Sequence, residues 1–545
     1  MSQRLPTESP QHQSPLHVAG QSGIVVVLLL FALVVGVGSF LLSERARKAS
    51  ITQRDAITEL ALKQAKDALI AYATTHTVLD PDSPNGPGYL PCPDKDDDGD
   101  SDWNCGNYSG TSAQSRRLGR LPWKTLKLPD LRDSSGERLW YAVSSVYKNS
   151  ALKPGLNPDT GMGTITVRDS TGNVIHDGTL GDGADDIYKA QTGGAVAIII
   201  APGPPLTRRE SMDSATGAMQ DRSCSGGCDN DGRCTASPEE LTAKCNPLNY
   251  LDKAAGQPFG DEDNANFMDV NVGRQGNTNG FIQGPVYSAA QELLVNDRII
   301  VVTYDDIMQA MMKRVAVEAY HCLAQYIYNP SDPTSPANLG RYPFAAPTCR
   351  SGYANANQWS DGKGVLFGRF PTARFVRSNA ASNGAMLDTW TADAPQSCSI
   401  GKAAASSPWF ESWKEHVFFA LGSNYQPGSG VSQDCSSGGC LQIVDRLGNS
   451  IGQDKQFAVL VSGPPLNTTL QPQERANANK RSLGNYLEGT NNTLESMNDI
   501  SAISECDDMK TLFSQSAACS PPSACNRITV APKSDNFNDL VLFFP

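Results

Sequence analysis

The residues best suited to chemistry lie in YLPCPDKDDDGDSDWNCG, residues 89–106, where six aspartates stand between two cysteines. Carboxylates at alternate positions followed by a glycine are typical of the first half of a calcium-binding loop, because Ca²⁺ prefers oxygen ligands and glycine permits the tight turn. The candidate metal ligands are Asp94, Asp96, Asp98, Asp100 and Asp102. Position 12 of such a loop is Cys105 in place of a bidentate Glu, so the stretch is not an EF-hand. The alternative is a solvated acidic turn held by a disulfide between Cys92 and Cys105.

The chain has fourteen cysteines, and many of them are closely spaced. An even number of cysteines in Gly-, Ser- and Asp-rich surroundings predicts disulfides formed in an oxidising compartment. The closely spaced candidates are Cys92 and Cys105, Cys224 and Cys228, Cys435 and Cys440, and Cys519 and Cys525. A zinc site is the alternative for Cys224, Cys228, Cys234 and Cys245, but these residues lack CxxC spacing and a nearby histidine.

Motifs for catalysis are scarce. GNSIG, residues 448–452, fits the GxSxG pattern of a nucleophile elbow around Ser450, the basis for reading the chain as an anchored hydrolase. The matching stretch earlier in the chain, GNVIHDG, has Val174 at that position, so we favour a hairpin turn. Neither a GxxxxGK[ST] phosphate loop nor an HExxH zinc motif occurs. We therefore expect a protein that is not an enzyme, and the net charge of −12 argues against nucleic acid as a partner.

The elements that must position these residues begin with an apolar segment. Residues 23–42, GIVVVLLLFALVVGVGSFLL, carry no charge and predict a transmembrane helix. Residues 1–22 are rich in Pro, Ser and Gln, and we expect a disordered cytoplasmic leader there. Three basic residues after the span would keep the rest of the chain in the cytoplasm by the positive-inside rule. The cysteines favour the opposite orientation, with the C-terminal region periplasmic or on the cell surface, and we adopt it.

The segment after the span predicts a long helix. Residues 43–76 contain no Pro or Gly, and apolar residues recur at helical spacing between Ile57 and Tyr72. Anchor and amphipathic stalk would then form one helix of about fifty residues, roughly 75 Å long.

Seven stretches of the remaining chain recur in the same order, which predicts a tandem duplication. The matches are LALKQAKDALIAYA with RVAVEAYHCLAQYI, GRLP with GRFP, LWYAVSSVY with VFFALGSNY, ITVRDSTGNVI with QIVDRLGNSI, AVAIIIAPGPPL with FAVLVSGPPL, NYLD with NYLE, and NDRIIVV with NDLVLFF. Each unit is expected to hold a helix followed by mostly antiparallel strands, with the boundary near Tyr304.

An apolar helix that runs into a stalk and then a disulfide-bearing sheet resembles type IV pilins and type II secretion pseudopilins. GYLPCPDKDDDGD followed by GRLPWKTLKLPDLRDSSGERLWYAVS is similar to a group of large pilin-like exported proteins of Gram-negative bacteria. The resemblance implies a filament with the apolar helix at its core and the sheet facing outward. It also implies calcium at Asp94, Asp96, Asp98 and Asp100, because some pseudopilins bind calcium in an acidic loop.

The chain departs from the pilin pattern at the leader. Pilin precursors are cut after a glycine, with a glutamate five residues into the mature chain. Cleavage after the candidate Gly23 would place Leu28 there, and cleavage after Gly20 would place Val25. A large globular part suits a minor component better than a repeating subunit.

These observations predict an α+β protein: a leader over 1–22, a transmembrane helix over 23–42, a stalk helix with a first pilin-like lobe over 43–304, and a second lobe over 305–545. The expected function is a non-enzymatic minor pilin or pseudopilin of a type IV pilus or type II secretion system, held in the inner membrane by a single span. Its partners would be other subunits, contacted through the apolar helix. The alternative is an envelope-anchored adhesin or binding protein that never enters a filament.

Overall fold

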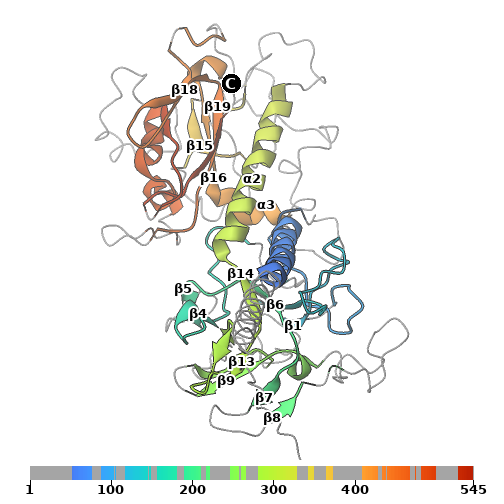
Figure 1. Ribbon diagram of the computed structural model, residues 1–545. Helices are drawn as coiled ribbons and strands as arrows, with labels where there is room; N and C mark the ends of the chain where they lie inside the picture. The colour runs from blue at the N-terminus through green and yellow to red at the C-terminus, as the bar shows by residue number, and fades with distance from the viewer. Residues whose placement is uncertain are drawn as a thin grey trace, which may run out of the picture. The chain divides into compact units, whose positions relative to one another are not determined.

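The computed structural model describes part of the 545-residue chain (Figure 1). The described residues are 52–75, 88–102, 105, 117–144, 147–148, 156–180, 190–209, 217–220, 222, 246–256, 259–265, 280–327, 342–348, 364–371, 408–426, 433–436, 438–466, 473, 475, 480–498, 526–534 and 536–543. The chain divides into two units, residues 1–60 and residues 61–545. We call residues 61–303 the first half of the larger unit and residues 304–545 its second half.

The predicted fold class, which includes an N-terminal transmembrane helix, is wrong. Among the described residues, none of the helices is both long and apolar enough to cross a membrane. The helix over residues 52–75 carries Arg54, Glu59, Lys63 and Lys66, so its apolar residues form one stripe only. The segment 23–42, including Gly23, lies outside the described residues.

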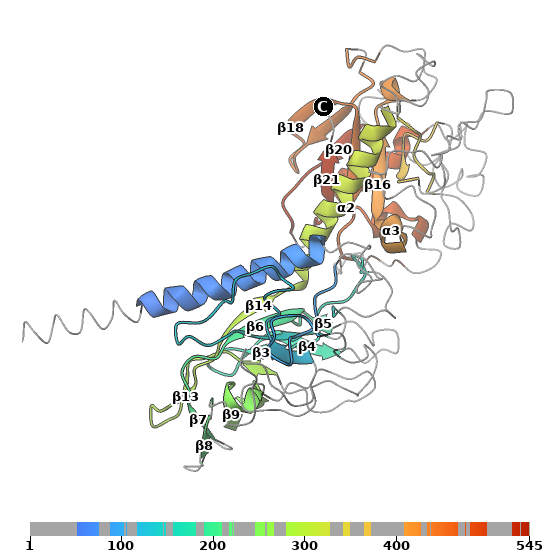
Figure 2. The same ribbon diagram turned by 90° about the vertical axis from the view of Figure 1, so that its right-hand side faces the viewer.

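Helical spacing did predict two helices. Residues 52–75 are helical, and within the larger unit Ala65, Leu69 and Ala73 recur every four residues and are fully buried. The second helix is α2 (Tyr304–Ile327), which packs on β19 and β21 (Figure 2). A short helix, α3 (Pro408–Trp413), precedes the sheet strand β16.

A four-stranded antiparallel sheet is the centre of the first half. Its order is β1 (Leu118–Arg120), β2 (Trp140–Val143), β6 (Ala197–Ala201) and β14 (Arg298–Val302). All five residues of β6 are buried because both faces of the sheet are covered. Ala197, Ile199 and Ala201 join one apolar cluster, whereas Ile198 and Ile200 join another on the opposite face.

A sheet of the same design is the centre of the second half. Its order is β15 (Phe367–Arg369), β16 (Val417–Leu421), β19 (Phe457–Val461) and β21 (Leu540–Phe543), again antiparallel throughout. Alternate residues of β19 again divide between two apolar clusters, one of which is shared with the first half. Four of the seven matched stretches fall on corresponding strands of the two sheets: β1 and β15, β2 and β16, β6 and β19, and β14 and β21.

A smaller sheet accompanies each large one. In the first half its order is β11 (Phe281–Ile282), β3 (Val167–Arg168), β4 (Val174–Leu180) and β5 (Ala190–Thr192). In the second half it is β18 (Ser450–Lys455), β17 (Leu441–Val444) and β20 (Arg527–Thr529). Both contain one parallel pair, β3 with β11 and β17 with β20. The duplication therefore extends to strand direction.

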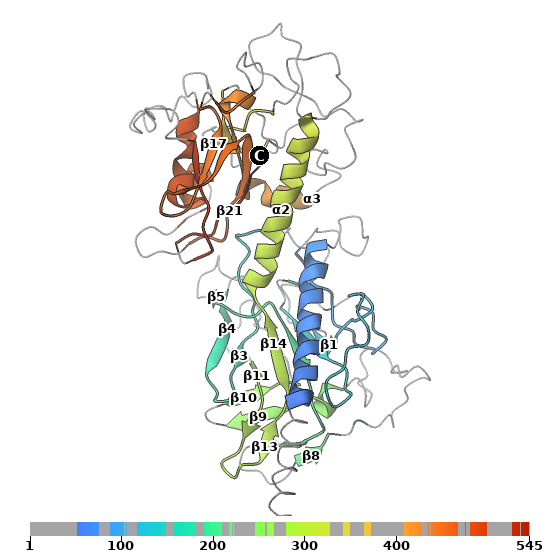
Figure 3. The same ribbon diagram turned by 45° about the horizontal axis from the view of Figure 1, so that its top comes forward.

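The remaining elements are short, and several are labelled in Figure 3. They are β7 (Thr207–Arg209), β8 (Gly217–Met219), β9 (Lys253–Gly256), β10 (Gly260–Asp263), β12 (Val286–Tyr287), β13 (Leu293–Val295), and the 3-10 helices η2 (Pro247–Asn249), η5 (Lys414–His416), η6 (Ser423–Tyr425), η8 (Leu483–Asn485) and η9 (Gly489–Met497).

Candidate functional site

The acidic loop is built around one buried aspartate. Asp94 is 1% exposed, and its backbone exchanges two hydrogen bonds with Arg120 of β1. Its carboxylate accepts hydrogen bonds from Asp97 N and Gly99 N, both at 2.7 Å. Asp97 has a φ of 62° and Gly99 a φ of 91°, so the chain curls around the Asp94 side chain. A Cβ at residue 99 would lie 2.6 Å from the Trp123 indole nitrogen, which explains the glycine.

Ion pairs and a disulfide fix this loop to the sheet. Arg138 Nη1 lies 2.9 Å from Asp97 Oδ1 and donates to the Asp97 carbonyl at 3.0 Å. Cys92 and Cys105 form a disulfide that closes the loop, with a Cα–Cα distance of 5.6 Å. The buried Lys148 donates to Cys105 O at 3.0 Å. The loop is therefore an integral part of the structure of the first half.

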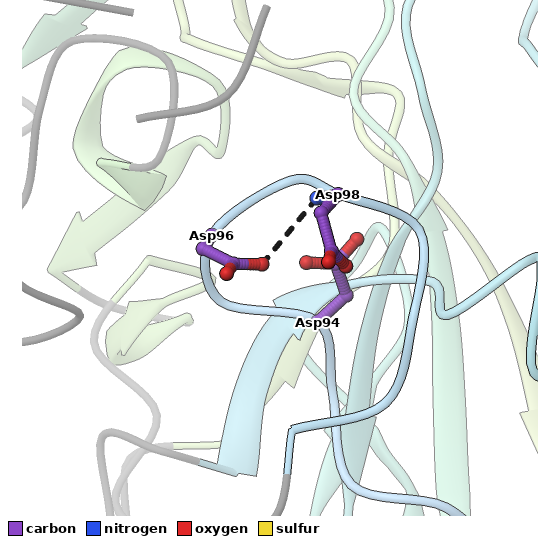
Figure 4. A group of neighbouring side chains, drawn as sticks. All are labelled: Asp94, Asp96 and Asp98. Carbon is purple, nitrogen blue, oxygen red and sulfur yellow. Dashed lines mark hydrogen bonds between the residues drawn. The ribbon is translucent and has the colours of Figure 1, made fainter. Parts of the chain in front are cut away.

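Three of the five candidate ligands come together. Asp94, Asp96 and Asp98 each present an oxygen within 4.8 Å of the others (Figure 4). Asp98 N also donates to Asp96 Oδ1 at 3.4 Å, the interaction dashed in Figure 4. Asp100 and Asp102 are not in this group. Asp102 accepts from Lys95 N at 2.6 Å, and Asp100 Oδ2 lies 3.9 Å from Lys124 Nζ.

The electrostatics of the group favour a bound positive charge. The pKa of Asp94 is raised to about 8, chiefly by burial; the hydrogen bond from Gly99 opposes this shift, and the charges of Asp97, Asp96 and Asp98 add to it. Burial also raises the pKa of Asp102 to about 6. Oxygen ligands in a constrained loop suit Ca²⁺, and a divalent cation would offset the mutual repulsion of the carboxylates. These three carboxylates are therefore the residues of the loop that could hold a cation.

The other predicted cysteines divide into two sets. Cys435 and Cys440 form a disulfide across five residues of sequence, with a Cα–Cα distance of 5.3 Å. Cys322 of α2, which the sequence did not single out, is also disulfide-bonded. The predicted residues Cys224, Cys228, Cys519 and Cys525 lie outside the described residues.

The serine of GNSIG lies at a hairpin. Ser450 is the first residue of β18, which runs antiparallel to β17. The Asp445 carboxylate holds the turn by accepting from Leu447 N at 2.9 Å and Asn449 N at 2.8 Å. Asp169 accepts from Thr171 N and Asn173 N in the same manner in the first half. The hairpin interpretation of this motif is confirmed.

A duplicated arginine site escaped the sequence analysis. Arg222 and Arg475 each donate from Nε to an asparagine carbonyl, from Nη1 to a glycine carbonyl and from Nη2 to a glutamine side chain, and each lies over a tyrosine ring. These partners are Asn249, Gly203, Gln220 and Tyr250 in the first half, and Asn485, Gly463, Gln473 and Tyr486 in the second. QDR at 220–222 and QER at 473–475, each between a GPPL and an NYL motif, carry the signal that could have found it.

A duplicated carboxyl pair lies beside each arginine site. In each half, one carboxyl of the pair accepts a hydrogen bond from the glutamine side chain two residues before the arginine. The other carboxyl accepts from a buried asparagine, whose side-chain amide also donates to and accepts from the backbone of one residue in a neighbouring strand. The sets are Asp252, Asp297 and Asn264 in the first half, and Glu488, Asp539 and Asn491 in the second. Burial raises the pKa of Asp297 and of Asp539 well above the ordinary value, and the paired carboxyl adds to the effect. We assign these networks a structural role.

No protein-family model, curated protein or solved structure matches the chain.

Proposed function

We propose that the chain is a non-enzymatic, exported component of a type IV pilus or type II secretion system, of the minor pilin or pseudopilin kind. The observation that carries the proposal is a helix packed on a four-stranded antiparallel sheet in each half. The buried stripe of the helix over residues 52–75 shares an apolar cluster with residues of β2 and β6, and α2 contacts β19 and β21. This is the arrangement that the pilin resemblance of GYLPCPD and GRLPW predicts. Its partners would be other subunits of the same assembly, on the outer side of the inner membrane.

Disulfides and the acidic loop support an extracytoplasmic location. Disulfide bonds persist mainly in oxidising compartments, and two of the close cysteine pairs have bonded geometry. We further propose that the group of Asp94, Asp96 and Asp98 binds Ca²⁺, as a structural clamp. Extracellular calcium sites need only millimolar-range affinity, which a loop with three facing carboxylates can supply.

A second candidate function is an exported adhesin or binding protein that remains outside filaments. A groove of about 380 Å³ favours it, because grooves of that size accommodate small ligands. The groove lies between α2 and β21, with Met308 and Met312 on one side, Leu540 on the other, and the Asp305–Lys533 ion pair at its edge.

Immunogold labelling of sheared surface filaments separates the two functions. Labelling along or at the tips of filaments is expected for a minor pilin. Label confined to cell envelopes, with filaments unlabelled in both the wild type and an overexpressing strain, would reject the filament role and favour the binding protein.

A further inference from the structure

The small sheets of the two halves share a bulged hairpin. In the first half β3 turns into β4 around Asp169, and in the second half β17 turns into β18 around Asp445. The register of each strand pair shifts where one extra residue stands in the second strand, which is a β-bulge. That residue is Ile175 in β4 and Ile451 in β18, and the two side chains are 46% and 56% exposed. The strands β4 and β18 are therefore equivalent at this end, residue by residue.

The outer edge of β4 is covered, whereas that of β18 is not. Residues 181–196 separate β4 from β6 and supply β5, which pairs antiparallel with β4 through Asp177 and Thr192. In the second half a single residue, Gln456, separates β18 from β19. The chain therefore has no segment at this point that could form a counterpart of β5. In the part of the chain that the structure describes, β17 is the one strand paired with β18.

The exposure of β18 follows from the missing strand. Beside β5, Asp177 is half-buried and Gly178 is buried, but the equivalent residues Gln453 and Asp454 are both exposed. Leu447 in the preceding turn is 87% exposed. An edge strand presents a row of backbone N–H and C=O groups that can pair with another strand. β18 thus offers solvent a sheet edge with apolar side chains next to it.

We propose that β18 is a docking edge, at which a second copy of this chain adds its own β18 in antiparallel orientation. Strand addition is made by main-chain hydrogen bonds, so the incoming strand must also have a free edge. The outer edges of β1 and β15 are already bridged, by Asp94 and Ala346 respectively. The β18 edge of a second copy meets the requirement, because a twofold axis brings identical edges together antiparallel. This pairing goes beyond the proposed function and does not depend on it.

The chemistry of β18 is compatible with its own copy. Asp454 and Lys455 carry opposite charges, so the strand has no net charge to repel its partner. The exposed Ile451 of each copy gains an apolar neighbour across the new pair. The bulge does not prevent pairing, since β4 has the same bulge and still accepts β5. One strand pair makes a small interface, so the dimer is weak and depends on concentration.

The test is hydrogen–deuterium exchange of the full chain in detergent, at about 1 µM and about 300 µM, a range suited to a weak interface. The peptide that covers residues 450–455 should exchange more slowly at the higher concentration. The slowing should reach roughly tenfold where nine-tenths of the chains are paired, because only the unpaired strand exchanges. The peptide that covers residues 174–180, whose edge β5 occupies, should exchange equally at both concentrations. Equal exchange of residues 450–455 at both concentrations would overturn the proposal, whatever other contacts the chains make.

The duplication supplies a matched pair of variants. Ile451→Lys adds a positive charge to both edge strands and should abolish the concentration dependence. Ile175→Lys makes the same change at the equivalent bulge of β4 and should retain it. Both side chains are exposed, so neither change should disturb the fold. Concentration dependence that survives in Ile451→Lys, or that Ile175→Lys removes equally, would also overturn the proposal.

Discussion

Asp94 and Arg120 exchange two backbone hydrogen bonds, at 3.0 Å and 2.6 Å. Ala346 and Arg369 do the same in the second half, both at 2.9 Å. The acidic loop is thus an elaboration of a position that both halves share, and the second half has a methyl group where the first has a carboxylate. A cation bound by Asp94 would act on the same strand that holds Arg120 against Trp140 and Tyr250.

Calcium should stabilise the protein through Asp96 and Asp98. Millimolar Ca²⁺ should raise the melting temperature by a few degrees over chelator, because a ligand that binds only the folded state adds stability by mass action. The double variant Asp96→Asn/Asp98→Asn should lose that difference. Asp100→Asn, which removes a carboxylate outside the group, should retain it. Identical melting curves of the wild type with calcium and with chelator would favour a solvated turn.

Calcium affinity should rise with pH. The pKa of Asp94 is raised to about 8 without a metal, so at neutral pH its carboxyl must lose a proton before it can bind the ion. Affinity should increase by up to roughly tenfold per pH unit between pH 6 and 8. Isothermal titration calorimetry in buffers of different ionisation enthalpy would count the released protons. If the calcium affinity were the same at pH 6 and pH 8 and no protons were released on binding, Asp94 would be excluded as a ligand.

The disulfides Cys92–Cys105 and Cys435–Cys440 should differ in their contribution to stability. Cys92–Cys105 spans thirteen residues and Cys435–Cys440 spans five. If a disulfide stabilises the fold by restricting the unfolded chain, loss of Cys92–Cys105 lowers the free energy of unfolding by about 3 kcal/mol and loss of Cys435–Cys440 by about 2 kcal/mol. Denaturant unfolding of the paired Cys→Ser variants measures both values. A larger loss from the shorter loop would contradict this order.

The buried asparagines should be equally important in both halves. Asn264 and Asn491 each bond to a carboxylate and, in both directions, to a strand backbone. Replacement by alanine leaves these partners unsatisfied and should cost roughly 2–4 kcal/mol of unfolding free energy at each position. The exposed Asn173→Ala is the control, with an expected change below about 0.5 kcal/mol. A loss in one half alone would show that the networks are not equivalent.

The sequence predicted those parts of the fold whose residues are apolar and periodic. Spacing at 57–72 predicted one helix, and the match of RVAVEAYHCLAQYI, residues 314–327, to that segment predicted a second. The matched stretches also predicted the correspondence of the two sheets.

The equivalence of Asp94 and Ala346 could not be predicted. The two positions share only backbone hydrogen bonds, which leave no residue preference in the sequence. The grouping of Asp94, Asp96 and Asp98 also depends on the folded loop: Asp102 accepts from the Lys95 amide, and Asp97, with its positive φ, turns the chain. The Arg475–Asp159 pair joins residues 316 positions apart and has no local pattern.

The redox state of the cysteines in the cell tests the proposed export, because an exported structural protein must acquire its disulfides in an oxidising compartment. Intact cells would be treated with a membrane-permeant alkylating reagent before lysis, and the cysteine peptides identified by mass spectrometry. We expect Cys92 joined to Cys105 and Cys435 joined to Cys440, with none of the four alkylated. Alkylation of all four by the permeant reagent, and of none by an impermeant one, would place the chain in the cytoplasm and contradict the account.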